Sequence, residues 1–149
     1  MTEEASSHDE AREIFRRALE RHAARDTAAS IDLTREALAR DPSYAEALEH
    51  LAVLLITRRR AYREGLDAIE RAVATRDDDP GLWYTLGWCY EFAAHEIARR
   101  GSPDETLDPR ELYERAAEGF RCCLALHPEG KLVGDAEDLL DHVENELRA

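Results

Sequence analysis

The segment Trp83–Tyr90 constrains the fold of this chain more than any other. It reads Trp-x-x-Leu-Gly-x-x-Tyr, so its three large residues, Trp83, Leu86 and Tyr90, share one face of a helix. Gly87 stands beside Leu86, where the missing side chain permits a neighbouring helix to come close. The segment therefore predicts a helix whose aromatic face is packed tightly against other helices.

The pattern of this segment occurs earlier in the chain at a constant offset, since 83 − 48 = 35. The earlier positions are Leu48, Leu51, Ala52 and Leu55, which match Trp83, Leu86, Gly87 and Tyr90. A second pattern of small, large and small residues recurs as Gly65-Ile69-Ala72 and Ala116-Phe120-Cys123, and in a degraded form, with Thr34 in place of a large residue, as Ser30-Thr34-Ala37. A period near 35 residues is typical of helical hairpins that stack on one another.

Apolar residues at helical spacing predict about seven helices along the whole chain. We interpret Ser7-x-x-Glu10 and Ser43-x-x-Glu46 as capping boxes that begin two of these helices. The expected units are a flexible tail at 1–8, three hairpins at 9–42, 43–79 and 80–128, and a C-terminal capping helix at 131–149.

The third hairpin carries an insertion near 93–109. The interval between its two small positions is 116 − 87 = 29 residues, compared with 65 − 52 = 13 in the second hairpin. The insertion is expected to lengthen both helices, with the first continuing to Arg100 and the second beginning at Asp108-Pro109. We expect the loop between them to project beyond the rest of the stack.

These patterns resemble the tetratricopeptide repeat family over roughly residues 10–128. The resemblance implies an all-α fold, a right-handed superhelical α-solenoid of antiparallel hairpins, whose open end is covered by a helix with a polar outer face. It also implies that the first helices of the units line a concave groove, and that the groove holds a segment of a partner protein. The expected function is that of a scaffold or adaptor.

The resemblance places a largely apolar row of side chains in this groove. Its members are Phe15 and Leu19 with His22 in the first unit, Glu49, Val53 and Ile56 in the second, and Tyr84, Trp88, Glu91 and Phe92 in the third. One subclass of the family grips the C-terminal carboxylate of its partner with lysines and asparagines. Here the matching places hold Glu49, Val53, Tyr84 and Trp88, so we expect an amphipathic helix or an extended apolar segment instead.

Other occupants of the groove stay open at this point. The C-terminal helix, the N-terminal tail or a second copy of the chain could fill it, and the last case would make the protein a self-assembling homodimer. A further alternative is a small acidic chaperone, similar to those of bacterial secretion systems, that shields an apolar segment of one client.

A local basic patch consists of Arg58, Arg59, Arg60 and Arg63. It is suited to an acidic segment or a phosphate, although four charges at a turn are also explained by simple solvation.

Composition sets limits on the class of partner and on the compartment. A net charge of −13 argues against nucleic acid and anionic membranes as partners, because both would be repelled. Cys89, Cys122 and Cys123 form neither a disulfide framework nor a Cys-x-x-Cys site. With no signal peptide or membrane segment in the pattern, the expected location is the cytoplasm.

The sequence carries no catalytic motif, and we expect no enzyme and no cofactor. The six histidines are scattered along the chain. Glu46 with His50 and Glu91 with His95 stand one helical turn apart, which leaves weak metal capture as an alternative to ordinary surface pairs.

Overall fold

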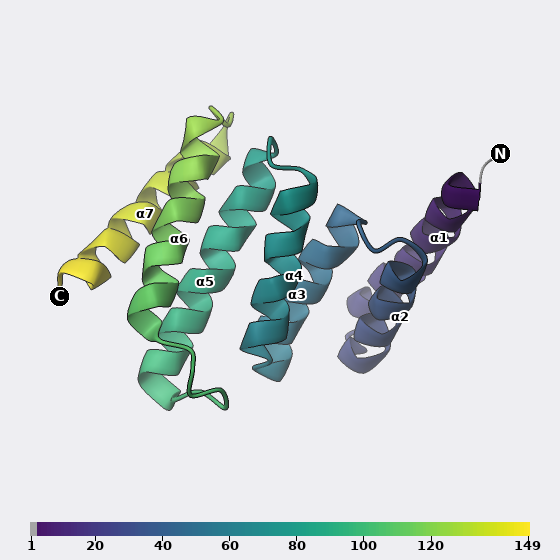
Figure 1. Cartoon of the computed structure of the whole chain (residues 1–149), viewed down its shortest axis with the longest axis horizontal. Helices are drawn as coiled ribbons and strands as arrows, with labels where there is room; N and C mark the ends of the chain where they lie inside the picture. The colour runs from purple at the N-terminus through teal and green to yellow at the C-terminus, as the bar shows by residue number, and fades with distance from the viewer. Residues whose placement is uncertain (1–2) are drawn as a thin grey trace.

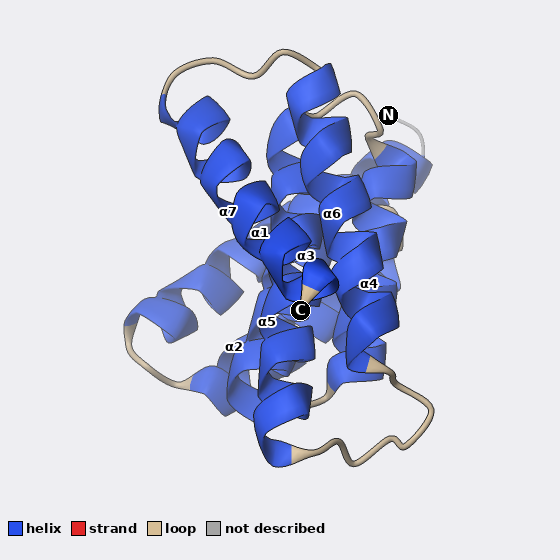
Figure 2. Ribbon diagram, turned by 90° about the vertical axis from the view of Figure 1, so that its left-hand side faces the viewer, coloured by secondary structure: helices blue, strands red, loops and turns tan. Residues whose placement is uncertain are grey.

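A computed structural model of the chain describes residues 3–149, which form seven helices and no strand (Figure 2). The helices are α1 (Glu3–Ala23), α2 (Thr27–Arg40), α3 (Ala45–Arg59), α4 (Tyr62–Thr75), α5 (Pro80–Arg100), α6 (Pro109–Ala125) and α7 (Lys131–Arg148). The prediction of an all-α solenoid is confirmed. None of the helices within this range is both long and apolar enough to cross a membrane.

Consecutive helices run antiparallel and form three hairpins side by side, from α1 and α2 at one end to α7 at the other (Figure 1). In addition to its hairpin partner, α5 contacts α3 on one side and α7 on the other. The odd-numbered helices therefore form one layer of the stack, and the even-numbered helices form the second.

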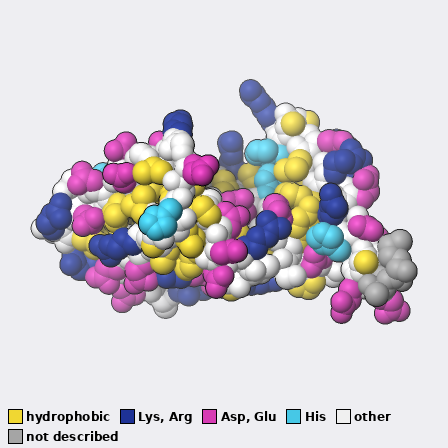
Figure 3. Space-filling view, turned by 90° about the horizontal axis from the view of Figure 1, so that it is seen from above, with side chains coloured by type: hydrophobic (Ala, Val, Ile, Leu, Met, Phe, Trp, Pro, Cys, Tyr) yellow, Lys and Arg dark blue, Asp and Glu magenta, His cyan; other side chains and the backbone are white. Residues whose placement is uncertain are grey.

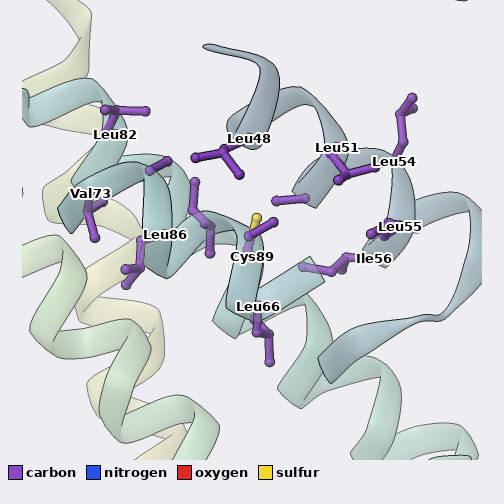
Figure 4. Close-up of a cluster of buried hydrophobic side chains, with 14 of the residues drawn as sticks. Leu48, Leu51, Leu54, Leu55, Ile56, Leu66, Val73, Leu82, Leu86 and Cys89 are labelled. Carbon is purple, nitrogen blue, oxygen red and sulfur yellow. The ribbon is translucent and has the colours of Figure 1, made fainter. Parts of the chain in front are cut away.

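Apolar side chains of α3, α4 and α5 meet between these layers, as the close-up in Figure 4 shows. Leu48, Leu55 and Leu86, three of the positions that define the repeat, are at most 2% exposed. Full burial of a leucine side chain contributes about 1.5–3 kcal/mol to stability. The repeat pattern thus corresponds to a continuous core that no single hairpin could bury alone.

The two helices of the third hairpin approach each other closely at small residues. A Cβ atom on Gly119 of α6 would lie 2.9 Å from the backbone nitrogen of Gly87 in α5. This agrees with the prediction that Gly87 marks a close approach between helices.

Both predicted capping boxes are wrong. Helix α1 begins at Glu3, so Ser7 lies inside it, and residues 3–8 of the predicted flexible tail are helical while residues 1–2 lie outside the described range. Acidic residues in the first turn favour this early start through the helix dipole. Helix α3 begins at Ala45 with Tyr44 as its N-cap residue, because the Ser43 hydroxyl donates to Asp41 instead.

The helix lengths in the third hairpin are as predicted, since α5 continues to Arg100 and α6 begins at Pro109. The loop between them, residues 101–107, does not stand free. It lies against the start of α4, where Arg60 donates to the carbonyl of Gly101 at 2.9 Å and Arg63 bonds to Asp104. In Figure 1 the loop occupies the lower end of the stack.

Helix α7 packs along α6 and also reaches α5 (Figure 1). It buries Ala136 and Val143, while Leu132, Leu139, Leu140 and Leu147 are partly buried against the core. Its other side carries exposed acidic residues, including Glu137, Asp138 and Asp141. The last hairpin is therefore covered by an amphipathic helix with a polar outer face.

Candidate partner-binding groove

The inner layer of the stack is hollowed where α1, α3 and α5 face one side of the molecule. This inner hollow has a volume of about 430 Å³. Its lining residues are Phe15, Leu19, Glu46, Glu49, His50, Val53 and Thr85. Figure 3 views the stack from above and shows hydrophobic side chains around histidines, with acidic side chains among them and along the edge.

Phe15, Leu19 and Val53 supply the apolar part of the hollow. Phe15 is 7% exposed, and its ring packs edge-on against Tyr44 and His50, with centroids 5.2 and 5.6 Å apart. Leu19 is 43% exposed, which is the highest exposure of a large apolar side chain among residues 3–149. The floor of the hollow is thus a buried, well-packed aromatic ring, and one of its walls is an apolar side chain open to solvent.

Glu49 is the most enclosed acidic group of the hollow. The Thr85 hydroxyl lies 3.1 Å from the carbonyl of Gly81 in its own helix and donates over the shorter distance of 2.7 Å to Glu49 Oε2, which connects α3 to α5. Burial raises the pKa of Glu49, the bond from Thr85 opposes that rise, and the charges of Asp79 and Glu46 add to it. Within residues 3–149, no cation forms an ion pair with Glu49.

His50 lies beside Glu49 but supplies no positive charge at neutral pH. The Ser30 hydroxyl donates to the carbonyl of Ala18 at 2.9 Å and lies 3.0 Å from His50 Nε2. Because serine has a single hydroxyl proton, Nε2 of His50 acts as the donor in this contact. Burial, with a smaller effect from the charge of His22, lowers the pKa of His50 to about 4.

A second and larger hollow of about 660 Å³ continues the groove towards the N-terminal part of α1 and the start of α3. It shares Phe15, Leu19 and Glu46 with the inner hollow. Its remaining lining residues are His8, Asp9, Arg12, Glu13, Arg16, Tyr44 and Arg76. The groove is thus apolar in its middle and charged along its rim.

Of the residues predicted for the groove, Phe15, Leu19, Glu49 and Val53 line the inner hollow. The prediction for Ile56 is wrong. Its side chain is fully buried and points towards α4, where a Cβ atom on Gly65 would lie 2.6 Å from Ile56 Cγ1.

The groove residues predicted on α5 lie partly under α7. Tyr84 packs edge-on against Phe120, with ring centroids 5.8 Å apart, so it faces α6 rather than the hollow. Glu91 lies 3.5 Å from His142 of α7, and burial raises the pKa of its carboxyl. Helix α7 therefore covers the groove around Glu91 and leaves the hollow beside α1 and α3 open.

Trp88 and Phe92 form a stacked aromatic pair further along α5. Their ring centroids are 5.3 Å apart, with an interplanar angle of 23°. Both side chains are partly buried and pack against the core. They extend the apolar surface of α5 without lining the inner hollow.

The four arginines of the predicted basic patch do not form one surface. Arg60 and Arg63 bind the chain's own loop at 101–106, whereas Arg58 and Arg59 are exposed. The acidic segment that suits this patch is thus supplied by Asp104 of the same chain.

Sequence reasoning missed His50, Thr85 and Glu46 as lining residues of the hollow. A signal was present for two of them, because His50 and Thr85 occupy the same place in successive units, 85 − 50 = 35. Both are polar, whereas the repeat pattern is defined by apolar positions, and the hollow has a polar row next to its apolar one.

The two Glu–His pairs that stand one helical turn apart in the sequence have other partners in the structure. Glu46 pairs with Arg76, and Glu91 pairs with His142, so neither forms a site with the histidine one turn along its own helix. No group of three or more His, Cys, Asp or Glu residues in 3–149 is arranged to hold a metal ion. Cys89 is buried in the core, which raises the pKa of its thiol to about 12.

The stacked hairpins, the close glycine contacts and the covering C-terminal helix together define the tetratricopeptide-repeat fold. No family model and no curated protein sequence matches the chain. Among solved structures, the chain is similar to the tetratricopeptide domain of Arabidopsis OM64, with 14% identity, a TM-score of 0.68, and 93% of this chain and 98% of that chain covered.

Two further structures share the fold. The first tetratricopeptide domain of Spaghetti (RPAP3), solved with the HSP90 peptide SRMEEVD, gives 14% identity, a TM-score of 0.69, and coverage of 93% and 94%. A chain of the CopN–Scc3 complex gives 16% identity, a TM-score of 0.61, and coverage of 93% and 69%. At these identities the shared feature is the fold.

Proposed function

We propose that this protein is an interaction module that holds a segment of a partner protein in the inner hollow. The single observation that carries the proposal is that the stack and its C-terminal helix leave this hollow open, with Leu19 43% exposed beside Phe15 and Val53. Exposed apolar side chains beside a concave surface are typical of a binding site. The RPAP3 domain, which has the same fold, was solved with a peptide bound.

The proposed partner segment is an amphipathic helix or an extended stretch with apolar anchors. Its anchors would bury Leu19 and Val53 from solvent, and its backbone would lie along α1, α3 and α5. Binding through a few apolar anchors in a preformed concave surface is a common mode of peptide recognition. The role would be that of a scaffold or adaptor, and catalysis is no part of it.

Selection from a random-peptide display library tests the proposal. Peptides enriched on the wild-type protein are titrated against Leu19→Asn and against the matched control Leu126→Asn. Leu126 is also an exposed large apolar residue, at 36%, but it lies at the end of α6. Loss of one buried leucine should weaken binding roughly tenfold or more in Leu19→Asn only. Equal binding by both variants would overturn the proposal.

A second candidate function is that of a small chaperone for one client. The net charge of −13 on a stack of three hairpins favours it. Purification from the native source distinguishes the two roles, since a dedicated chaperone should bring down a single client at a fixed ratio. Several unrelated partners would favour the scaffold.

Self-association is the remaining alternative, because a second copy could cover the same hollow. Light scattering over a range of concentrations decides it. A dimer that loses its peptide binding as concentration rises would support it, and a monomer at every concentration would remove it.

A further inference from the structure

We infer that the segment bound in the inner hollow carries an arginine or lysine that pairs with Glu49. The inference rests on the proposed function, and it adds the chemical class of the partner. The charge of the hollow would thus select the segment together with its apolar lining.

Glu49 has unused capacity for a cation. A carboxylate offers about four acceptor positions, and the Thr85 hydroxyl occupies one of them, on Oε2. The side chain lines the hollow at a half-buried position between α3 and α5. A guanidinium or ammonium group that enters the hollow can therefore bond to Glu49 without breaking an existing contact.

The cations around the groove do not neutralise Glu49. Arg76 pairs with Glu46 at 2.8 Å, and Arg16 pairs with Glu13 and Glu20 on its own helix. Arg12 lines only the second, larger hollow and is exposed. His50, the immediate neighbour, is neutral for the reasons given above.

Glu49 lies near other acidic groups and is partly shielded from water. Asp79 and Glu46 act on Glu49 with the same sign of charge, and burial removes part of its hydration. A partner cation relieves both effects, since it restores a charge partner in a setting where screening by water is weak. The net charge of −13 also attracts basic segments from a distance.

The apolar neighbours favour a long basic side chain. Leu19 and Val53 line the same hollow as Glu49, so the methylene stem of an arginine or lysine can pack on them while its charged end reaches the carboxylate. The peptide in the RPAP3 complex, SRMEEVD, ends in acidic residues, whereas this hollow prefers the opposite charge.

The test uses the library-selected peptides, each synthesised in three forms at its basic position. The forms carry arginine, the uncharged isostere citrulline, or glutamate. Their binding is measured by fluorescence anisotropy with wild type, Glu49→Gln, Glu49→Arg and the control Glu137→Gln. Glutamine can still accept the hydrogen bond from Thr85, so Glu49→Gln removes the charge and keeps the fold. Glu137→Gln removes the same charge at an exposed place on α7.

The inference expects peptides that share an arginine or lysine among apolar residues. Citrulline should weaken binding to wild type and to Glu137→Gln roughly ten- to a hundredfold, as loss of a charged hydrogen bond does, and should have little effect on Glu49→Gln. Glu49→Arg should prefer the glutamate form.

Two negative outcomes are distinguishable. Peptides that need Leu19 but bind equally well as arginine and citrulline forms would overturn the inference and leave the proposed function standing. If no selected peptide depends on Leu19, the proposed function fails and the inference fails with it.

Discussion

Gly87 of α5 faces the ring of Phe120 of α6 so closely that a Cβ atom on Gly87 would lie 2.7 Å from Phe120 Cε1. Two further ring atoms of Phe120 would lie within 2.9 Å of it. Because Phe120 is fully buried, its ring has little room to move away. This contact lets the two long helices of the third hairpin pack side by side.

Gly87→Ala should therefore destabilise the protein. Overpacking of a tight core contact costs about 1–3 kcal/mol, and urea denaturation measures it. The matched control is Gly134→Ala in α7, where an added Cβ would meet nothing within 4 Å. That control should stabilise the helix by about 0.5–1 kcal/mol. Wild-type stability in Gly87→Ala would contradict the packing described for α5 and α6.

Glu70 of α4 joins three helices on the other side of the stack. Arg115 of α6 donates to it at 2.6 and 2.9 Å, and the Tyr90 hydroxyl of α5 donates at 2.7 Å. Burial raises the pKa of Glu70, but the hydrogen bonds from Arg115 and Tyr90 outweigh it, so the pKa lies below its ordinary value of 4.5.

Glu70→Gln should lower the free energy of unfolding by about 1–2 kcal/mol at neutral pH, with allowance for the partial exposure of the Glu70–Arg115 pair. A lowered pKa in the folded state stabilises the protein above the ordinary carboxyl pKa, and this contribution disappears as pH falls through the folded value. The difference in unfolding free energy between wild type and Glu70→Gln, measured by urea denaturation, should thus become smaller at acidic pH. A difference that stays constant down to the lowest pH at which both proteins fold would show that the charge of Glu70 has no role.

His50 gives the protein a second dependence on pH, in a higher range. Its folded pKa is about 4, compared with 6.5 ordinarily, so the unfolded chain binds more protons between these values. Stability should therefore fall as pH decreases from 6.5 towards 4. His50→Gln should show a shallower decrease over that window in a series of urea denaturation curves. Identical slopes for the two proteins would contradict the burial of a neutral imidazole between Ser30 and Phe15.

The loop at 101–107 should loosen when its contact with α4 is removed. Arg63 bonds to both Asp104 and Thr106, and the hydrogen bonds from Thr106 and Arg63 lower the pKa of Asp104 to about 2. Arg63→Ala should speed amide hydrogen exchange at Thr106, whereas Arg59→Ala, at an exposed arginine that ends α3, should not. Equal exchange in the two variants would mean that the loop is held by its own turns.

The repeat positions were predictable from the sequence because they are governed by local spacing. Leu48, Leu86 and Gly87 recur with a fixed period, and residues with that period must face the same neighbour in each unit. The end of α5 and the start of α6 followed from Gly101 and Pro109, which act on the backbone directly.

The details that the sequence did not reveal depend on contacts between distant segments. The start of α1 is one example: the acidic residues of its first turn favour it locally, and His8 in addition bonds to Asp41 at the end of α2, 33 residues away, at 2.6 Å. The direction of Ile56 is another, because it is decided by the space above Gly65 in the next helix. Tyr84 was assigned to the groove because no local pattern shows that α6 and α7 take up its ring.

Mapping a bound peptide on the isotope-labelled protein by NMR tests the central claim most directly. With a library-selected peptide added, amide shifts should concentrate on the inner faces of α1, α3 and α5, around Leu19, Glu49 and Thr85. Shifts confined to the outer helices α2, α4 and α6, or to α7, would contradict the account.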